Sequence, residues 1–270
     1  MNQLLRRLAA TLLLGLGAAL PASATTFSTD FTDIWFVPSE DGWGINLIQQ
    51  GNTLFATLFV YAPDGSARWY IASQLNAGTG TTTFTGPLNE TRGPTFTAPF
   101  TGLTSNQPVG TMTISFSGPN RGALVYTVNG AQVNKVIERF AYRLNDLAGN
   151  YLGGMTAIAS SCGNPANNGA ALIMNELTVQ HGGGTPRFIV DFTTAAGAAA
   201  QCTFTGAYQQ LGKLGLVQNG TFSCTGGAGN TGTFTMSEIH ATRGGFTSVF
   251  TGQDQFCRYN GFFGGTRDVF

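Results

Sequence analysis

Charge is scarce in this chain. Only 10% of its 270 residues are Asp, Glu, Lys or Arg, whereas roughly 25% is usual in a soluble domain. Acidic and basic residues number 13 each, so the formal net charge is zero. Because no excess of cations is available to displace counterions from a phosphate backbone, the composition argues against a nucleic-acid-binding protein.

Stretches suited to long helices are missing as well. After the first 24 residues, the chain has no long segment rich in Ala, Leu, Glu, Lys and Arg, the residues that favour helix. It has instead 38 glycines, 36 threonines and 21 phenylalanines. The 42% of hydrophobic residues excludes the disorder typical of charged, weakly hydrophobic chains. The composition therefore predicts an all-β protein.

Long apolar runs are absent except at the N-terminus. That run has 13 residues, 8–20, follows Arg6 and Arg7, and ends at Pro21 and the small residues 22–24. It is too short to cross a bilayer core, which takes about 20 helical residues. A basic start, a short apolar run and small residues are typical of an export signal, although a buried N-terminal helix is an alternative.

We therefore predict a signal peptide over residues 1–24. Its removal would leave a net charge of −2 and place the protein in the periplasm or outside the cell, with association with the cell surface left open. No later apolar run is long enough for a transmembrane helix, so none is predicted in the mature chain.

Cysteine is confined to the second half of the chain. The four residues form no C-x-x-C pair: Cys162, Cys202, Cys224 and Cys257. In an oxidising compartment they predict two disulfides, with three pairings possible. We favour Cys202–Cys224 across a hairpin and Cys162–Cys257 between the first and last strands of one domain. The spacing does not suit zinc, for which only two histidines could add ligands, so we predict no metal site and no cofactor.

Strand-like runs and turn signals alternate over residues 33–143. Pro63-Asp64-Gly65 and Asn129-Gly130 are strong turn signals, and residues 111–117 alternate cleanly between apolar and polar. About eight short strands with short connections result. Such a meander must protect its edges, and closing into an up-and-down barrel does so.

The second half repeats this style after Asn145-Asp146, with hairpin signals at Asn219-Gly220 and Gly244-Gly245. We predict a first domain over residues 25–143 and a second, disulfide-containing domain over residues 144–270. Each is expected to be an antiparallel, lipocalin- or avidin-like barrel of about eight strands. A pair of β-sandwiches stays open as an alternative, because strand spacing does not separate the two architectures.

One stretch of the first domain carries a distinctive motif. Residues 35–44 read WFVPSEDGWG, followed by Gln49-Gln50-Gly51 and Phe59-Val60-Tyr61. Over about residues 33–140 the chain resembles an uncharacterised family of exported proteobacterial proteins with a W-x-x-P-x-E-x-G-W-G opening, a QQG turn and an FVY sequel. The resemblance implies an exported module with these boundaries and no particular biochemical role.

Aromatic residues of the first domain are the candidate ligand-binding residues: Trp43, Trp69, Tyr70 and Phe59. Inward-facing aromatics of a small barrel either fill its interior or line a pocket for an apolar or sugar ligand. The strand over residues 54–61 is apolar on both faces. We expect its outer face to be covered too, for instance by the second domain.

A polar pair in the second domain is the other candidate. Under a period of two, Glu238 and His240 share a strand face with Phe234 and Met236, and Arg243 follows at a turn. If buried, Glu238 could orient His240 as a base or bind the polar end of a ligand. The alternative is a strand that runs from the core into solvent at its tip.

Few ionisable groups are present and no GxSxG nucleophile elbow occurs. We therefore predict a non-enzymatic exported protein that binds a small apolar or carbohydrate ligand or a cell-surface partner. The alternatives are a secreted hydrolase acting on a glycan or ester, with Glu238, His240 and Arg243 in its site, and a structural surface component. A pocket inside either barrel would favour ligand binding, whereas filled interiors with an exposed apolar patch would favour assembly.

Overall fold

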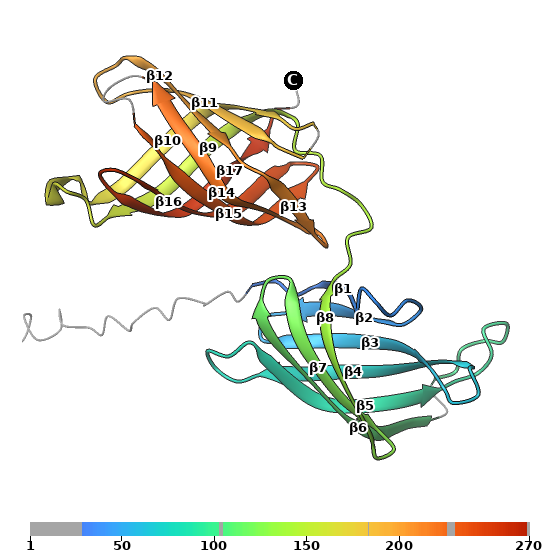
Figure 1. Cartoon of the computed structure of the whole chain (residues 1–270). Helices are drawn as coiled ribbons and strands as arrows, with labels where there is room; N and C mark the ends of the chain where they lie inside the picture. Colours follow the sequence, from blue (N-terminus) through green and yellow to red (C-terminus); the bar gives the residue numbers. More distant parts are fainter. Residues whose placement is uncertain (1–28, 103–104, 183, 226–229, 269–270) are drawn as a thin grey trace, which may run out of the picture.

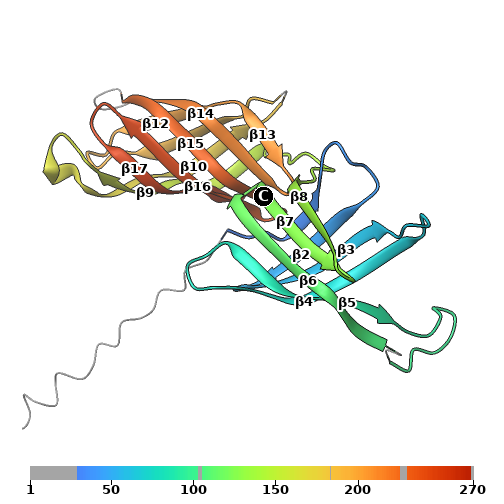
Figure 2. The ribbon, with the colours of Figure 1, turned by 60° about the horizontal axis from the view of Figure 1, so that its bottom comes forward.

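The computed structural model describes residues 29–102, 105–182, 184–225 and 230–268, so the predicted signal peptide lies outside the described residues. Two β-barrels follow each other along the chain and are joined by one connecting segment (Figure 1 and Figure 2). The prediction of two consecutive antiparallel barrels is confirmed, and the sandwich alternative is wrong. Asn145 and Asp146 lie in the connecting segment.

The first barrel is an up-and-down meander. Its strands are β1 (Asp33–Phe36), β2 (Gly44–Gln50), β3 (Thr53–Tyr61), β4 (Ala67–Ala77), β5 (Thr83–Arg92), β6 (Ser105–Gly118), β7 (Arg121–Val128) and β8 (Ala131–Arg139). Each strand pairs antiparallel with the next, and β1 pairs with β8 to close the barrel. Closure leaves no unpaired sheet edge.

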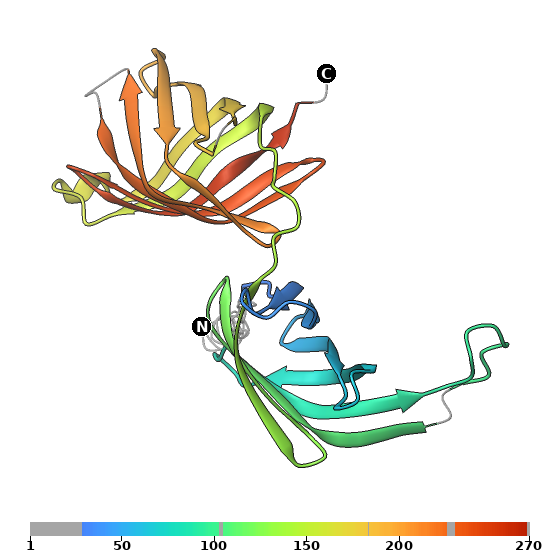
Figure 3. The same cartoon turned by 45° about the vertical axis from the view of Figure 1, so that its right-hand side comes forward.

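The hairpin of β5 and β6 extends beyond the other strands of this barrel. Figure 3 shows both strands reaching beyond their neighbours. The connection between them carries two exposed rings, Phe96 and Phe100.

The second barrel has the same order with one additional strand. Its strands are β9 (Gly149–Ser160), β10 (Gly169–Gln180), β11 (Arg187–Thr193), β12 (Ala199–Thr205), β13 (Tyr208–Leu211), β14 (Leu214–Thr225), β15 (Thr231–Thr242), β16 (Gly245–Asp254) and β17 (Arg258–Arg267). A short 3₁₀ helix, Pro165–Asn167, lies between β9 and β10. The first and last strands, β9 and β17, pair to close this barrel, β12 pairs with β14, and β13 extends from β14.

Side chains fill both interiors. In the first barrel, the rings of Phe31 and Phe116 stack at 3.7 Å against Trp35, which is fully buried. In the second, seven buried phenylalanines belong to one cluster: Phe188, Phe204, Phe222, Phe234, Phe246, Phe250 and Phe263. The described residues therefore form a packed core in each barrel rather than the hollow that an interior ligand would need.

Some glycines lie opposite phenylalanines on neighbouring strands, in both barrels. Gly220 lies directly opposite Phe234, and a Cβ at Gly220 would come within 2.4 Å of that ring. Gly122 lies opposite Phe116 in the first barrel, where a Cβ would come within 3.0 Å of the ring. The ring fills the space that the glycine leaves, which is how aromatic residues compensate for glycine in a strand.

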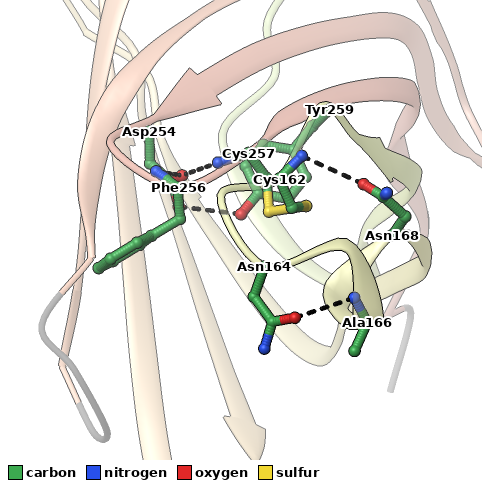
Figure 4. The surroundings of a disulfide bond; sticks show 8 residues. All are labelled: Cys162, Asn164, Ala166, Asn168, Asp254, Phe256, Cys257 and Tyr259. Atoms are coloured by element: carbon green, nitrogen blue, oxygen red, sulfur yellow. Dashed lines mark hydrogen bonds between the residues drawn. A yellow bond between two sulfur atoms is a disulfide. The ribbon is translucent and has the colours of Figure 1, made fainter.

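Both disulfides form as predicted. Cys162 follows β9 and is bonded to Cys257, which precedes β17 (Figure 4). Asp254 Oδ1 accepts from the Cys257 amide at 2.7 Å, so a side chain also fixes this turn. The second disulfide joins Cys202 and Cys224, directly opposite each other on β12 and β14. These strands do not form the simple hairpin that we expected, because β13 lies between them in the chain.

At one end of the first barrel, the guanidinium of an arginine stacks on the ring of a tryptophan. Trp35 Nε1 donates to the carbonyl of Phe31 at 3.0 Å. The guanidinium of Arg139, at the end of β8, lies 4.8 Å from the Trp35 ring. It donates to the carbonyls of Thr32 and Asp30, at 3.3 and 2.5 Å. The arginine thus ties the last strand to the segment that leads into the first.

The second barrel closes with the same arrangement. The Tyr151 hydroxyl donates to the carbonyl of Leu147, four residues earlier, at 2.7 Å. The guanidinium of Arg267, at the end of β17, lies 5.0 Å from the Tyr151 ring. It donates to the Ala148 carbonyl at 3.0 Å and to the Tyr151 hydroxyl at 2.8 Å. Each barrel therefore joins its first and last strands through an arginine stacked on an aromatic ring.

A turn of the second barrel docks on the closed end of the first. Asp33 Oδ2 accepts from Arg139 Nη1 at 2.9 Å and from the backbone amide of Lys213, between β13 and β14, at 2.8 Å. Lys213 Nζ also lies 2.5 Å from Asp30 Oδ2. Gly212 has a φ of +59°, and a Cβ there would come within 2.3 Å of the Asp33 carboxylate. Only glycine suits that position.

Candidate functional sites

The opening motif builds a polar cluster at the other end of the first barrel. Glu40 Oε2 accepts from the Trp43 indole at 2.8 Å. Lys135 Nζ, from β8, donates to Oε1 and Oε2 of Glu40 at 2.8 and 2.6 Å, and it lies 5.6 Å from the Trp43 ring. The hydrogen bonds from Lys135 and Trp43 hold the pKa of Glu40 below its ordinary value. The cluster ties the β1–β2 connection to β8.

Trp43 and Tyr70 are packing residues in this cluster. Both are partly buried against the core of the first barrel. Tyr126 lies beneath, almost fully buried. Burial raises the pKa of its hydroxyl, and Tyr70 and Glu40 raise it further. Two of the four predicted aromatic residues therefore help to fill one end of the barrel.

The other two predicted aromatic residues point outward. Phe59 and Trp69 lie directly opposite each other on β3 and β4, and their exposed fractions are 46% and 48%. Gly44 lies opposite Phe59 on β2, so no side chain covers that flank of the Phe59 ring. We expected the outer face of β3 to be covered. That expectation is wrong, because Phe55, Phe59 and Tyr61 are all exposed.

These rings belong to an uncharged face that we call the outer platform. It consists of outward-facing residues of β2, β3 and β4: Gly44, Asn46, Ile48, Gln50, Thr53, Phe55, Thr57, Phe59, Tyr61, Trp69, Ile71, Ser73, Gln74 and Asn76. Ile48 and Phe55 form an apolar row between two polar pairs, Asn46 with Thr57 and Gln50 with Thr53. Between Ile48, Phe55 and Asn76 the surface is hollowed by about 830 Å³. No Asp, Glu, Lys or Arg belongs to the platform.

The predicted shared face of β15 does not form. Glu238 has a φ of +53°, and the pairing of β15 with β16 shifts register between Ser237 and His240. This bulge inserts one residue and reverses the alternation. Ile239 is therefore fully buried, while His240 is exposed on the outer surface. The prediction that Glu238 and His240 continue the inward face is wrong.

The candidate hydrolase residues also do not converge. Glu238 Oε1 accepts from Thr29 Oγ1 at 2.9 Å, so it contacts the segment that leads into the first barrel. His240 lines a hollow on the outer face of the second barrel. Arg243 is exposed in the β15–β16 turn and lines a different hollow. The described geometry places no acid, base and cation around one reacting atom.

The hollow beside His240 has a volume of about 650 Å³ and is mainly apolar. Its floor is the pair Gly154 and Gly264, which lie opposite each other on β9 and β17. Leu152, Met174 and Phe262 surround the glycines and are exposed. We call this face of β9, β10 and β17 the glycine-centred patch. Sequence reasoning did not identify it.

Sequence reasoning also missed the buried pair of Asp33 and Arg139. Burial lowers the pKa of Arg139, and the Asp33 carboxylate opposes that change. A signal was present in β8, where Lys135 and Arg139 fall on the same period-two face as the core residue Ile137. Two cations on an apolar face indicate partners that are distant in the sequence.

Neither a cluster of metal ligands nor a membrane-spanning helix is found over the described part of the chain. Over these residues, no three His, Cys, Asp or Glu side chains gather as metal ligands. The described ranges also contain no helix with the length and hydropathy to span a bilayer.

Known proteins place no further constraint on these sites. No protein-family model matches the chain, and no curated protein or solved structure matches it either. The resemblance of residues 33–140 to an exported proteobacterial family therefore stays a prediction that rests on the quoted motifs.

Proposed function

We propose that this is an exported, non-enzymatic binding protein whose first barrel binds a neutral glycan on the outer platform. The observation that carries the proposal is the exposed pair of Phe59 and Trp69, set among amide and hydroxyl side chains without a charge. Both residues belong to the aromatic set that the sequence indicates, but they lie on the outside of the barrel and not in the interior pocket considered there.

The chemistry of the outer platform matches that of a sugar. Sugar rings present C–H faces, which pack on aromatic rings, and hydroxyls, which exchange hydrogen bonds with amides. Asn46, Gln50 and Asn76 supply both donors and acceptors. A face without ionised side chains spares a neutral ligand the cost of desolvating a charge when it binds.

The dimensions of the outer platform suit an extended chain. Phe55 and Phe59 are four residues apart on β3, which corresponds to about 13 Å along a strand. Phe55, Phe59 and Tyr61 follow one another along the outer face of β3, and the hollow lies at the Phe55 end of this series. We therefore expect several consecutive sugar units to contribute to binding, and single sugars to bind weakly.

Retention by neutral polysaccharides tests this proposal. The full chain is sedimented with cellulose, chitin, xylan and starch, and the affinity for oligosaccharides of the retained type is then measured by calorimetry. The double variant Phe59→Ala/Trp69→Ala should weaken binding more than tenfold, because a central aromatic residue commonly contributes about 2 kcal/mol. Phe96→Ala is the matched control, since Phe96 is fully exposed on the same barrel outside the platform.

Two results would contradict glycan binding by the platform. One is that the wild-type chain is retained by none of the polysaccharides. The other is that the double variant and the Phe96→Ala control bind equally well.

A structural role in a surface assembly is the second candidate. The glycine-centred patch favours it, because an apolar sheet face with glycines at its centre allows a second copy of the chain to approach closely. Analytical ultracentrifugation over a range of concentrations tests this idea. Phe262→Ser should shift a concentration-dependent dimer towards monomer, whereas a wild-type chain that stays monomeric throughout removes the candidate.

A further inference from the structure

A further hollow, separate from those near Phe55 and beside His240, lies where the connecting segment meets the closed end of the second barrel. It has a volume of about 650 Å³. Its walls are residues 142–146 of the connection, the β13–β14 turn at Lys213, the β15–β16 turn at Arg243, and Arg267 at the end of β17. This volume lies within the range of small-molecule sites, about 300–1,000 Å³.

Positive charge is concentrated in this hollow. Arg143, Lys213, Arg243 and Arg267 line it, and Asp146 is its one acidic residue. These four are more than a third of the eleven lysines and arginines beyond residue 28. The same stretch of chain contains 13 acidic residues, so the hollow is a local positive site on a chain that is slightly negative overall.

Most of this charge is not paired with a carboxylate. Within the described chain, Lys213 forms an ion pair with Asp30. Burial raises the pKa of Asp30, but hydrogen bonds from Lys213 and Thr32 lower it by more, so the pKa lies below its ordinary value. Arg267 donates only to neutral groups. The Asp146 carboxylate accepts from the backbone amide of Ala148.

The remaining two arginines, Arg143 and Arg243, form neither an ion pair nor a hydrogen bond through their guanidinium groups with another described residue. Both are exposed. Because they come from the connecting segment and from the β15–β16 turn, they line the hollow from different elements. Guanidinium groups bind phosphate and carboxylate through two parallel hydrogen bonds, which lysine does not match.

The hollow also has an apolar part. Tyr142 and Leu144 flank Arg143 in the chain, line the same hollow and are largely exposed. A bare inorganic ion would occupy a small fraction of the volume and would leave these side chains in water. A ligand with an anionic group and an organic body would contact both parts.

We propose that this hollow binds a small organic phosphate, with the phosphate held by Arg143 and Arg243 beside Lys213 and Arg267, and the organic part against Tyr142 and Leu144. The site is separate from the outer platform and shares no residue with it.

Calorimetric titration of the full chain with phenyl phosphate tests the proposal. Wild-type protein should bind phenyl phosphate more tightly than inorganic phosphate, and phenol should not bind. Arg143→Gln/Arg243→Gln should weaken phenyl phosphate binding about a hundredfold, since each arginine contributes charge-assisted hydrogen bonds. Arg258→Gln is the matched control, because Arg258 is an exposed arginine at the start of β17 and the hollow at its end does not include it.

Three outcomes would overturn the proposal. The first is no binding of phenyl phosphate to the wild-type chain, and the second is equally tight binding by the double variant and by Arg258→Gln. The third is binding only to vesicles of phosphatidylglycerol in phosphatidylcholine, which would make the site a contact for an anionic lipid surface. Phe59→Ala/Trp69→Ala should bind phenyl phosphate normally, so failure of the glycan proposal and failure of this one are distinguishable.

Discussion

The first barrel contains all three tryptophans and no cysteine, whereas the second contains all four cysteines and no tryptophan. Both are antiparallel barrels closed by an arginine stacked on an aromatic ring, Arg139 on Trp35 and Arg267 on Tyr151. Only Arg139 is paired with a buried carboxylate, and only the second barrel is cross-linked. The first barrel therefore adds a buried ion pair to the stacked arginine, whereas the second barrel adds two disulfides.

The distribution of tryptophan makes this comparison measurable. Tryptophan fluorescence reports on the first barrel alone, because Trp35, Trp43 and Trp69 all belong to it. Hydrogen exchange of β9 to β17 reports on the second. Each change below should act on one reporter more than on the other.

The largest effect is expected from removing the longer disulfide. Cys162→Ala/Cys257→Ala opens a link with a sequence separation of 95 residues, and the chain-entropy model gives about 4.7 kcal/mol for a loop of 100 residues. Urea unfolding should show earlier exchange in β9 to β17, while the tryptophan transition stays in place. If both transitions move together, the barrels unfold as one cooperative unit and the comparison fails.

Arg139→Met should have the next largest effect, on the first barrel. Removing the guanidinium leaves Asp33 buried without its partner, and breaking a buried pair in this way costs about 3–5 kcal/mol. The midpoint of the tryptophan transition should fall accordingly. The control Arg139→Met/Asp33→Asn removes the unpaired charge and should recover part of the loss. No recovery would mean that stacking on Trp35, rather than the ion pair, matters most.

Arg267→Met is the matched change in the second barrel, and we expect a smaller effect. Arg267 donates to a carbonyl and a hydroxyl, so its loss leaves no buried carboxylate behind. Two hydrogen bonds and a stacked cation together contribute about 1–3 kcal/mol. Hydrogen exchange of β9 and β17 is the measurement. A loss as large as that for Arg139→Met would contradict the view that Asp33 distinguishes the two closures.

Patterns local in the sequence predicted the fold well. Period-two alternation placed Met112, Ile114 and Phe116 on the inner side of β6, where they are buried. Of the three possible cysteine pairings, the favoured one forms. The β-bulge in β15, which depends on the backbone conformation of one residue, could not be predicted from such local patterns. The positive φ at Glu238 is unusual for a non-glycine residue, and nothing in the local sequence signals the bulge that turns His240 outward.

The sequence analysis also missed an ion pair between residues distant in the sequence, and it did not predict which face of one strand meets the core. Asp33 and Arg139 are separated by 106 residues, so no local pattern joins them. Residues 54–61 are apolar on both faces, and hydrophobicity alone does not say which face meets the core. Packing assigned Leu54 and Leu58 to the interior and left Phe59 exposed for the outer platform.

The smallest effect concerns the other end of the first barrel and depends on pH. Hydrogen bonds from Lys135 and Trp43 hold the pKa of Glu40 below its usual 4.5 in the folded chain. A lowered folded pKa gives stability that is present above the unfolded pKa and is lost as pH falls through the folded pKa. The tryptophan transition of the wild type should therefore weaken as pH falls below about 4.5. Lys135→Met should reduce this pH dependence, because it removes the ammonium that donates to both oxygens of the Glu40 carboxylate. Arg121→Met is the control, since Arg121 is an exposed cation of the same barrel that forms no ion pair with another described residue. Equal pH profiles for wild type and Lys135→Met would mean that the indole of Trp43, rather than the ammonium, sets the titration of Glu40.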